Sequence, residues 1–505
     1  MTSLSHHLTG TPGAGEARRS AEVPAGELEA TTRALLSEGY RLALVSAVDG
    51  PGPMRAVYLF TAGPPDRRVE LIVPLEREHP EVPSLAGLSF PASRFEREMH
   101  DLFGIVPVGH PFLHRLVLHQ HWPEGWHPMR QGAGPAPDMV DDAGPYPFVE
   151  VQGSGTYEIP VGPVHAGLIE PGHFRFSVVG ETILKMTARL WFLHKGTEKL
   201  FEGRDIHDGL ELAERVSGDT AVGHGLAYCL AVEEACGAEV PERASELRMA
   251  LLELERIYNH VADVGALCND VGFGIVHARA LTLRERLLRL NAAVTGHRLL
   301  RGGVRLAGAR VAALPSPDEL AAIGEQFHEL VDLALGQSTV MDRFTGTAVL
   351  PLEDVEALGV LGVVARASGS SFDARIAHPL VALARDFEPA GAATGDVLGR
   401  FQVRVAEVDA SLTLLTDLCA RPGPLRTEGP LRCLGGSGSG VVEGWRGATA
   451  HRVEVDDAGR LARVKVVDPS FFNWPALALA LTDTIVPDFP LANKSFNLSY
   501  AGNDL

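Results

Sequence analysis

Several short segments of the chain gather side chains that could do chemistry. The richest, residues 109–128, reads GHPFLHRLVLHQHWPEGWHP and holds five of the twenty histidines: His110, His114, His119, His121 and His127. Imidazoles gathered in this way could ligate zinc or nickel. Their spacing matches no zinc-finger or HExxH pattern, so structural histidines in a turn-rich segment are favoured over a metal site.

A charged segment precedes these histidines. Residues 94–105, RFEREMHDLFGI, interleave the acidic Glu96, Glu98 and Asp101 with the basic Arg94 and Arg97. Side chains three and four residues apart meet on one face of a helix and form local ion pairs. The composition therefore favours a solvated helix face over a functional site.

Polar side chains also stand beside tight turns further along the chain. Residues 162–176, GPVHAGLIEPGHFRF, hold His165, Glu170, His173 and Arg175 close to Gly and Pro. Turns place polar side chains at loop tips, where sites are commonly built. Spacing alone leaves a site and ordinary loop polarity equally open.

Two further segments match no catalytic or phosphate-binding motif. Residues 214–225, ERVSGDTAVGHG, include Ser217, Thr220 and His224, but their spacing is not that of a nucleophile, and the chain has no GxSxG elbow. The glycine run GGSGSG at 435–440 lacks both the Walker lysine and the GxGxxG register. A phosphate cradle is therefore not expected there.

The overall content of charge and sulfur excludes some classes of function. Lys plus Arg number 45 and Asp plus Glu 64, so the formal charge is −19. Such acidity is a poor match to nucleic acid and to unaided docking on anionic lipid. The cysteines form no CxxC pair, which argues against cysteine-ligated zinc or iron–sulfur clusters and fits a reducing cytoplasm. There are five: Cys229, Cys236, Cys268, Cys419 and Cys433.

The first elements that must position these residues form a small domain. Residues 1–25 lack the apolar core of a secretory signal, and a flexible N-terminus is expected there. A short helix is expected over residues 26–38. Three strands follow between Gly/Pro turns, at 41–50, 55–63 and 67–76. These elements predict an α+β domain over residues 26–121.

A second domain is expected over residues 151–505, after a linker at 122–150 that is rich in Pro, Gly and Asp. It begins with strands and turns and then shows apolar residues at helical spacing, which predicts a helix bundle. Near the end, β-like runs predict a hairpin with its turn near Asp457–Gly459. The expected class is α+β, a small mixed domain followed by a mainly helical domain with peripheral β-hairpins. No uncharged apolar run reaches about 18 residues, so the chain is not expected to span a bilayer by itself.

These segments, in this order, resemble a known superfamily. RFEREMHDLFGIVPVGHPFLHRL resembles the signature of the C-type subunits of NADH:quinone oxidoreductase, which is respiratory complex I. The later segments resemble the large subunit of membrane-bound nickel–iron hydrogenases, above all the hydrogenase-4 and formate hydrogenlyase type, in which C-like and D-like parts are fused. The resemblance covers roughly residues 30–505. Its later segments are GPVHAGLIEPGHFRF, HKGTEKL, ERVSGDTAVGHG, RMALLELERIYNHVADVG, MDRFTGTAVL, ARASGSSFDAR and VEGWRGATAHRVEVDDAGRLARVKVVDPSFFNWPAL.

The chain departs from this family at the metal ligands. A nickel–iron site needs four thiolates, because soft sulfur ligands hold its two metals. The family supplies them as two CxxC pairs. The early pair falls on Ser217 and Thr220, and the late pair on Ser499 and Gly502. The resemblance therefore implies a hydrogenase-like scaffold without nickel.

Other positions keep the residues that the family uses. Glu170 matches the glutamate of a Glu–Gly–His loop that resembles a proton gate, Arg446 matches an arginine above the metal centre, and Asp504 matches an aspartate just past the last cysteine pair. With His173, these residues are the candidate catalytic set. His165, His173 and His224 are the candidate cofactor-binding residues. In the D-type subunits of complex I, such a histidine hairpin binds the quinone head group, but the quinone tyrosine falls on Gly218 here.

The resemblance implies the fused large subunit of a membrane-bound redox complex. Its expected partners are a small iron–sulfur subunit that delivers electrons, a ferredoxin-like subunit and antiporter-like membrane subunits that translocate ions. Quinone is a possible ligand, nickel is not expected, and NADH would bind another subunit because this chain has no dinucleotide fingerprint. The expected location is the cytoplasmic side of the cell membrane, held there by partners. The alternative is a scaffold that holds the peripheral arm together without chemistry.

Overall fold

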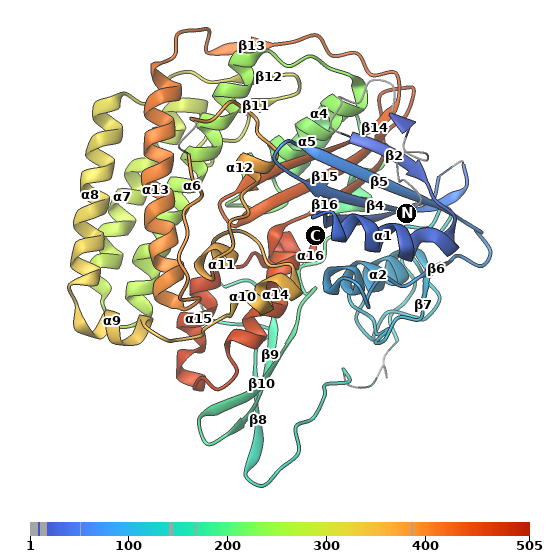
Figure 1. The fold of residues 1–505 in the computed structure, drawn as a ribbon, viewed down its shortest axis with the longest axis horizontal. Helices are drawn as coiled ribbons and strands as arrows, with labels where there is room; N and C mark the ends of the chain where they lie inside the picture. The colour runs from blue at the N-terminus through green and yellow to red at the C-terminus, as the bar shows by residue number, and fades with distance from the viewer. Residues whose placement is uncertain are drawn as a thin grey trace.

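The first domain is built on a five-stranded sheet. The computed structural model describes residues 9–10, 18–50, 52–140, 144, 146–166, 169–384 and 387–505. The strand order is β1-β2-β5-β4-β3, and the two helices α1 and α2 lie beside the sheet (Figure 1). The predicted helix and three strands are confirmed. The elements of this domain are β1 (Thr9–Gly10), β2 (Arg18–Glu22), η2 (Ala25–Glu27), α1 (Leu28–Ser37), β3 (Arg41–Val48), β4 (Met54–Ala62), β5 (Arg67–Leu75), β6 (Glu81–Pro83), α2 (Phe90–Phe103) and β7 (Val106–Val108).

The expected flexible N-terminus is wrong for residues 18–22, which form strand β2 and pair in parallel with β5. The side chain of Arg18 is buried, and it forms ion pairs with Glu70 at 3.3 Å and Glu234 at 2.9 Å. Glu234 lies in the second domain, so one of the two acids that hold this strand is far from it in the sequence. Residues 1–8 and 11–17 lie outside the described residues.

The expected solvated face of residues 94–105 is also wrong. Helix α2 packs between the first sheet and the second domain, and Glu96, Glu98 and Asp101 are buried. Each of these carboxylates accepts hydrogen bonds from residues outside the segment 94–105. Asp101 Oδ2 accepts hydrogen bonds from three consecutive backbone N–H groups, those of residues 116–118.

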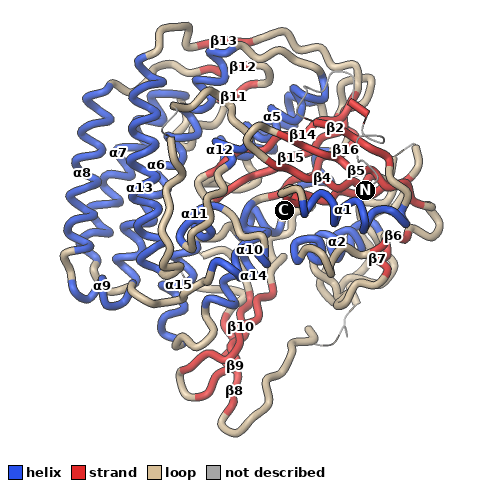
Figure 2. The backbone as a smooth tube through the Cα atoms, viewed as in Figure 1, coloured by secondary structure: helices blue, strands red, loops and turns tan. Residues whose placement is uncertain are grey.

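The second domain combines a helical layer with several small sheets. In the described part of residues 122–150 there is no helix or strand. Figure 2 then shows β8, β9 and β10 projecting from the lower end of the body as one antiparallel sheet, with the long helices gathered along the left side. The predicted α+β class, with a mainly helical second domain and peripheral hairpins, is confirmed. The elements up to the helical layer are β8 (Thr156–Val161), β9 (His173–Val179), β10 (Thr182–Arg189), α3 (Thr197–Phe201), α4 (Ile206–Ala213), α5 (Ala221–Cys236), α6 (Glu242–Asp270), α7 (Gly274–Thr295), β11 (Val304–Arg305), β12 (Gly308–Arg310) and α8 (Pro317–Leu335).

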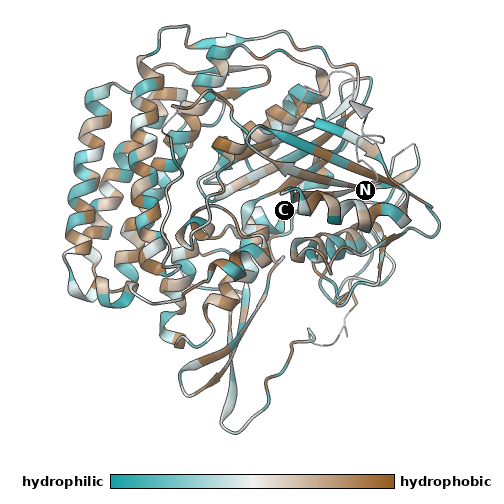
Figure 3. Cartoon of the chain, in the orientation of Figure 1, coloured by the Kyte–Doolittle hydropathy of each residue, from teal (hydrophilic) through white to brown (hydrophobic). Residues whose placement is uncertain are grey.

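The helical layer is amphipathic, as the sequence periodicity predicts. Along α8, the outermost helix, hydrophobic and hydrophilic residues alternate (Figure 3), and its buried residues include Leu320, Phe327 and Leu330. None of the helices in the described residues is long and apolar enough to cross a membrane. The remaining elements are α9 (Ser338–Phe344), α10 (Leu352–Leu358), α11 (Gly362–Ala367), α12 (Ala374–Ala377), α13 (Val397–Ala420), β13 (Arg426–Glu428), β14 (Gly436–Gly444), β15 (Gly447–Val455), β16 (Leu461–Val467), α14 (Pro469–Ala480), η3 (Val486–Asp488), α15 (Phe489–Phe496) and α16 (Tyr500–Asp504).

The glycine run at 435–440 lets strand β14 approach helix α5 closely. A Cβ atom added at Gly438 would lie 2.1 Å from the carbonyl oxygen of Ala231, and one at Gly440 would lie 2.2 Å from that of Ala227. Any side chain here would push the strand off the helix, so the glycines serve packing rather than phosphate binding. The predicted hairpin follows, with β15 and β16 joined through a turn at Asp456–Arg460.

One pair of cysteines departs from what the expected reducing cytoplasm would give. Cys236, at the end of α5, forms a disulfide with Cys433, 197 residues later. Cys229 and Cys268 are free and buried, where they act as small apolar side chains. Nothing in the local sequence pairs Cys236 with Cys433, because the pairing depends on α5 lying against the start of β14.

Candidate functional site

The structure brings together the segments in which the family's early and late cysteine pairs would fall. Ser217 lies just before helix α5 and Ser499 just before α16, and their hydroxyl oxygens are 2.8 Å apart. Ser217 also donates to Asp219 Oδ1 at 3.0 Å, so the shared proton of the two hydroxyls comes from Ser499. Ser499 in turn accepts from the backbone N–H of Gly502 at 2.8 Å. Both hydroxyl protons are therefore used inside the protein.

Position 502 has no room for a side chain. A Cβ atom on Gly502 would lie 2.5 Å from Oδ2 and 2.6 Å from Cγ of Asp468. Asp468 is fully buried, and its carboxylate is held from the other side by the backbone N–H of Ser470 and by His224. The Asp468 carboxylate thus occupies the space that a cysteine side chain at 502 would need.

Asp468, His224 and His451 form a buried row of titratable groups. His224 Nε2 donates to Asp468 Oδ2 at 3.1 Å, and His224 Nδ1 lies 3.0 Å from His451 Nε2. Burial, and then the nearby His224 imidazole, lowers the pKa of His451 well below its ordinary value. Both ring nitrogens of His224 are engaged within the protein, where His224 orients Asp468. The contact of His224 with a cofactor stays a prediction.

Arg446 makes a two-pronged ion pair at the edge of this site. Its two terminal nitrogens each lie 2.7 Å from one oxygen of Asp219, and one of them also donates to Thr220 Oγ1 at 3.2 Å. The guanidinium carbon stacks 3.8 Å above the ring of Trp445. Burial opposes the negative charge of Asp219, but Arg446 outweighs it and lowers the pKa of Asp219 to about 2. Because 37% of the Asp219 side chain is exposed, this pair faces the outside of the site.

Replacing Arg446 by alanine is expected to raise the pKa of Asp219 from about 2 toward its ordinary value of about 3.9. The folded pKa is depressed, so the pair adds stability above the unfolded pKa and loses it as the pH falls through the folded pKa. Infrared titration of the carboxylate band measures this shift, with Asp219→Asn identifying the signal. An Asp219 band that still titrates near pH 2 in the alanine variant would contradict the assigned cause.

Glu255 is a further titratable group behind the site. It is buried on helix α6 and accepts hydrogen bonds from the N–H groups of Val222 and Gly223, at 2.7 and 2.9 Å. Burial raises the pKa of Glu255 to about 8, despite these donors. The sequence offers no signal for this role, because a glutamate within an amphipathic helix is typical of a surface position.

The candidate residues of the hairpin loop lie against helix α16. Glu170 is exposed, and its Oε2 accepts from the backbone N–H of Ala501 at 3.1 Å, which places it close to Ser499 in the chain. His165 donates to the carbonyl oxygen of Gly172 at 2.8 Å, and His173 donates to that of Gly162 at 3.1 Å. These histidines hold the loop together through one ring nitrogen each.

Tyr500 is a residue of this region that sequence reasoning missed. It follows Ser499, is buried, and its ring edge lies 2.6 Å from where a Cβ atom of Gly172 would stand. Burial raises the pKa of Tyr500 to about 12. The aligned tyrosine position, Gly218, is exposed and has no atom within 4 Å of its added Cβ. The hairpin loop therefore meets a tyrosine that comes from the C-terminal segment.

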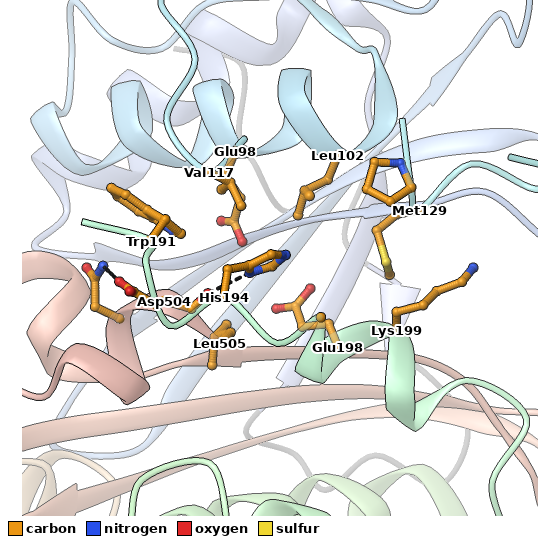
Figure 4. A pocket seen from close by; sticks show the side chains of 13 residues that line it. Glu98, Leu102, Val117, Met129, Trp191, His194, Glu198, Lys199, Asp504 and Leu505 are labelled. Atoms are coloured by element: carbon orange, nitrogen blue, oxygen red, sulfur yellow. Dashed lines mark hydrogen bonds between the residues drawn. The ribbon is translucent and has the colours of Figure 1, made fainter. Parts of the chain in front are cut away.

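Asp504 lies at the other end of α16, in a cavity of about 40 Å³ between the two domains (Figure 4). It is buried, and its Oδ2 accepts from the backbone N–H of Leu193 at 3.0 Å. Burial raises the pKa of Asp504 above its ordinary value. Asp504 therefore shares a helix with the Ser499 segment but faces a different space.

These residues do not fit a nickel–iron centre. Nickel and iron need thiolate ligands. The four aligned positions instead hold two serines whose hydroxyls are hydrogen-bonded to each other, a threonine that is hydrogen-bonded to Arg446, and a glycine with no room for a side chain. Within the described ranges, no three His, Cys, Asp or Glu side chains are grouped so that they could hold a metal ion. The metal alternative for the histidines of residues 109–128 is thus not supported. Four of them donate to backbone carbonyls instead, namely His110 to Ser93, His119 to Leu190, His121 to Val140 and His127 to Asp101.

Comparison with known proteins shows which family the chain belongs to. Residues 21–136 match the family described as respiratory-chain NADH dehydrogenase, 30 Kd subunit, and residues 270–433 match the 49 Kd subunit. Formate hydrogenlyase subunit 5 of Escherichia coli is 32% identical over 86% of this chain and 78% of its own length. Hydrogenase-4 component G of Escherichia coli is 34% identical over 81% of this chain and 73% of its own length.

A solved structure has the same fold over most of the chain. It is a chain of the membrane-bound sulfane sulfur reductase, an archaeal respiratory membrane complex, with a TM-score of 0.64 and 25% identity. The match covers 70% of this chain and 99% of that one. The order of the two matched regions is also the order of the two domains. The chain belongs to the complex I and membrane-bound hydrogenase superfamily, as a fused 30 Kd/49 Kd protein of the type of formate hydrogenlyase subunit 5 and hydrogenase-4 component G.

Proposed function

We propose that this chain is the peripheral large subunit of a membrane-bound redox complex that carries out no nickel–iron hydrogenase chemistry. The observation that carries the proposal is the closed site, in which Ser217 and Ser499 bond one another and Asp468 fills the space beside Gly502. A thiolate-bound metal centre cannot be built there without moving Asp468. The relatives named above supply the setting, a multi-subunit membrane complex.

The proposed role of the site is to hold and move protons while electrons pass nearby. Electrons would come from an iron–sulfur cluster in a small partner subunit, with a ferredoxin-like subunit further along the route. Charge added near a buried site raises proton affinity there, and groups whose pKa lies near neutrality respond first. Glu255 is such a group, because burial raises its pKa to about 8. Arg446 stays charged and holds Asp219 ionised.

The protonation of the site would be coupled to ion translocation in antiporter-like membrane subunits. These subunits would also hold the chain at the cytoplasmic side of the membrane. A quinone, if it binds, would supply two-electron reduction with proton uptake. The groups offered to it are the second ring nitrogens of His165 and His173 and the carboxylate of Glu170. The rival function is a scaffold without chemistry, and the observation that favours it is that the hydroxyl protons of Ser217 and Ser499 and both ring nitrogens of His224 are engaged within the protein.

One experiment separates these two functions. The complex is isolated through a tag on this chain, and its metals, hydrogen uptake, quinone reduction and ion transport are measured. We expect no stoichiometric nickel and no hydrogen uptake. Glu170→Gln and His173→Asn are expected to lower quinone-linked turnover by about 10²-fold or more, the usual contribution of a proton-transfer group. Arg446→Ala is also expected to lower it, because Arg446 holds Asp219 ionised.

Glu181→Gln is the matched control, because Glu181 is exposed on the same projecting sheet and lies at the turn between β9 and β10. It should leave turnover unchanged. Equal turnover in all four variants and the parent would support the scaffold and sink the redox role. Stoichiometric nickel would overturn the interpretation of Ser217, Thr220, Ser499 and Gly502.

A further inference from the structure

The cavity between the two domains is lined by groups that exchange protons. Its walls come from α2 of the first domain, from residues 191–199 and from the end of α16. The volume of about 40 Å³ is enough for one or a few water molecules. In Figure 4 the carboxyl groups of Glu98 and Glu198 approach this space from opposite sides, with His194 between them and Asp504 at one end.

Glu98 and Glu198 compete for one ammonium group. Lys465 Nζ lies 2.6 Å from Glu98 Oε1 and 3.0 Å from Glu198 Oε1. Glu198 has two further partners, the Arg463 guanidinium at 2.6 Å and the backbone N–H of Val466 at 3.1 Å. The protein therefore holds Glu198 as the carboxylate, and Glu98 is the member of the pair that can take up a proton.

The directions of the pKa shifts agree with this asymmetry. Burial raises the pKa of Glu98, and Lys465 only partly offsets it, whereas Arg463 and Lys465 lower the pKa of Glu198 in spite of burial. Other charged or titratable groups face Glu98 from every neighbouring element. They are Arg94 on α2, Lys465 and Arg463 on β16, Glu198 and Lys199 on α3, His194 before α3, and Asp504 on α16.

The cavity has an outer and an inner side. Lys199 stands at the outer side with 48% of its side chain exposed, and His194 beside it is half-buried. At the inner side, His194 Nδ1 donates to the backbone carbonyl oxygen of Asp504, at the end of helix α16, at 2.7 Å. Ser499 caps the start of α16, five residues before Asp504, which is about 7.5 Å along a helix axis.

We propose that Glu98 carries protons from solvent through the water of this cavity toward Asp504 and helix α16. The first domain would then supply a proton-transfer residue to the second. The Glu98 carboxylate takes a proton from a cavity water that exchanges with bulk hydronium, and then releases it through the same water to the Asp504 carboxylate. No electron moves in this step. The physiological use of this route rests on the proposed redox function, but the protonation of Glu98 does not.

Infrared difference spectroscopy on the purified complex tests the protonation directly. The parent should show a protonated carboxyl C=O band of Glu98 that persists to higher pH than the band of an ordinary glutamate and shifts in D₂O. Glu98→Gln should remove this band. Glu96→Gln is the matched control, because Glu96 is buried on the same helix but bonds to Ser84 and Leu85 and does not line the cavity. It should remove a different band.

Turnover tests the transfer. Glu98→Gln is expected to slow proton-coupled turnover by about 10²-fold and to raise its solvent isotope effect, and Glu98→Asp should restore most of the rate. If Glu98→Gln does not fold, Val117→Ile narrows the same cavity without touching a carboxyl group and should also slow turnover. A Glu98 carboxylate that stays ionised throughout, or a Glu98→Gln rate equal to that of Glu96→Gln, would overturn the proposal. A complex without any redox turnover would instead refute the proposed function, and the infrared result would still decide the state of Glu98.

Discussion

A cysteine introduced at position 502 is expected to destabilise the chain by about 1–3 kcal/mol, and this cost is expected to shrink once Asp468 is shortened. The added Cβ atom alone would lie 2.5 Å from Asp468 Oδ2. That carboxylate cannot simply swing away, because it is fully buried and bonded to His224 and to the N–H of Ser470. The single change Gly502→Cys must therefore break one of these bonds or shift helix α16.

The compensating change isolates the contact. Asp468→Ala alone leaves the Nε2–H of His224 without its acceptor, which costs about 1–3 kcal/mol. In the double variant Gly502→Cys, Asp468→Ala, the cysteine side chain enters the space that the carboxylate left. The double variant should therefore be more stable than the sum of the two single changes predicts.

Urea unfolding of the parent, both single variants and the double variant measures this coupling. Ser217→Cys is the matched control, because it introduces a cysteine in the same site at a position that already carries a side chain. Strict additivity of the two changes would contradict the direct contact between position 502 and Asp468. Nickel binding by the single variant Gly502→Cys would contradict the argument that the site is closed.

Replacing Glu407 by glutamine is expected to cost about 3–5 kcal/mol of unfolding free energy, a large effect for a single change. Glu407 lies on α13 with no exposed surface, and it faces three partners that are also fully buried. His260 Nε2 lies 2.7 Å from Oε2, Arg256 3.3 Å from Oε2 and Arg366 Nε 3.0 Å from Oε1. Replacing the carboxylate by an amide removes its negative charge, so the positive charges of Arg256 and Arg366 stay buried with less negative charge around them.

This cluster also predicts a pH dependence. Burial opposes the charge of Glu407, but Arg366 and then His260 hold the pKa of Glu407 well below its ordinary value. A depressed folded pKa contributes stability above the unfolded pKa of about 4.3, and this contribution is lost as the pH falls below it. The stability gap between the parent and Glu407→Gln should thus be full at neutral pH and should narrow in acid.

Urea unfolding at several pH values measures that gap. Glu325→Gln on the exposed face of α8 is the control and should change stability by no more than about 0.5 kcal/mol. A Glu407→Gln variant as stable as the Glu325→Gln control at neutral pH would show that the cluster adds nothing to the fold.

Local sequence patterns were sufficient for the elements that rest on local physics. The helix at Leu28–Ser37 and the strands at 41–48, 54–62 and 67–75 follow from apolar periodicity and Gly/Pro turns. The β15–β16 hairpin follows from its turn. These features depend on residues a few positions apart, so a short window of sequence contains their cause.

The buried charges escaped sequence reasoning because their partners are distant in the chain. Glu98 is typical of a solvated position until Lys465 is placed against it, 367 residues later. Arg18 lies in a segment that the sequence predicts to be flexible, and its ion pairs with Glu70 and Glu234 form only in the folded chain. A charge is buried only where an opposite charge or a donor is already positioned, and composition does not contain that position.

The sequence by itself determined the superfamily, the order of the two domains and the absence of cysteine at Ser217, Thr220, Ser499 and Gly502. Only the tertiary structure decided how these four positions are packed. Ser217 and Ser499 are 282 residues apart in sequence and meet at 2.8 Å, and the Asp468 carboxylate closes the space at Gly502. Residue types set which bonds are possible, whereas the packing of α5, β16 and α16 sets which atoms come within reach of one another.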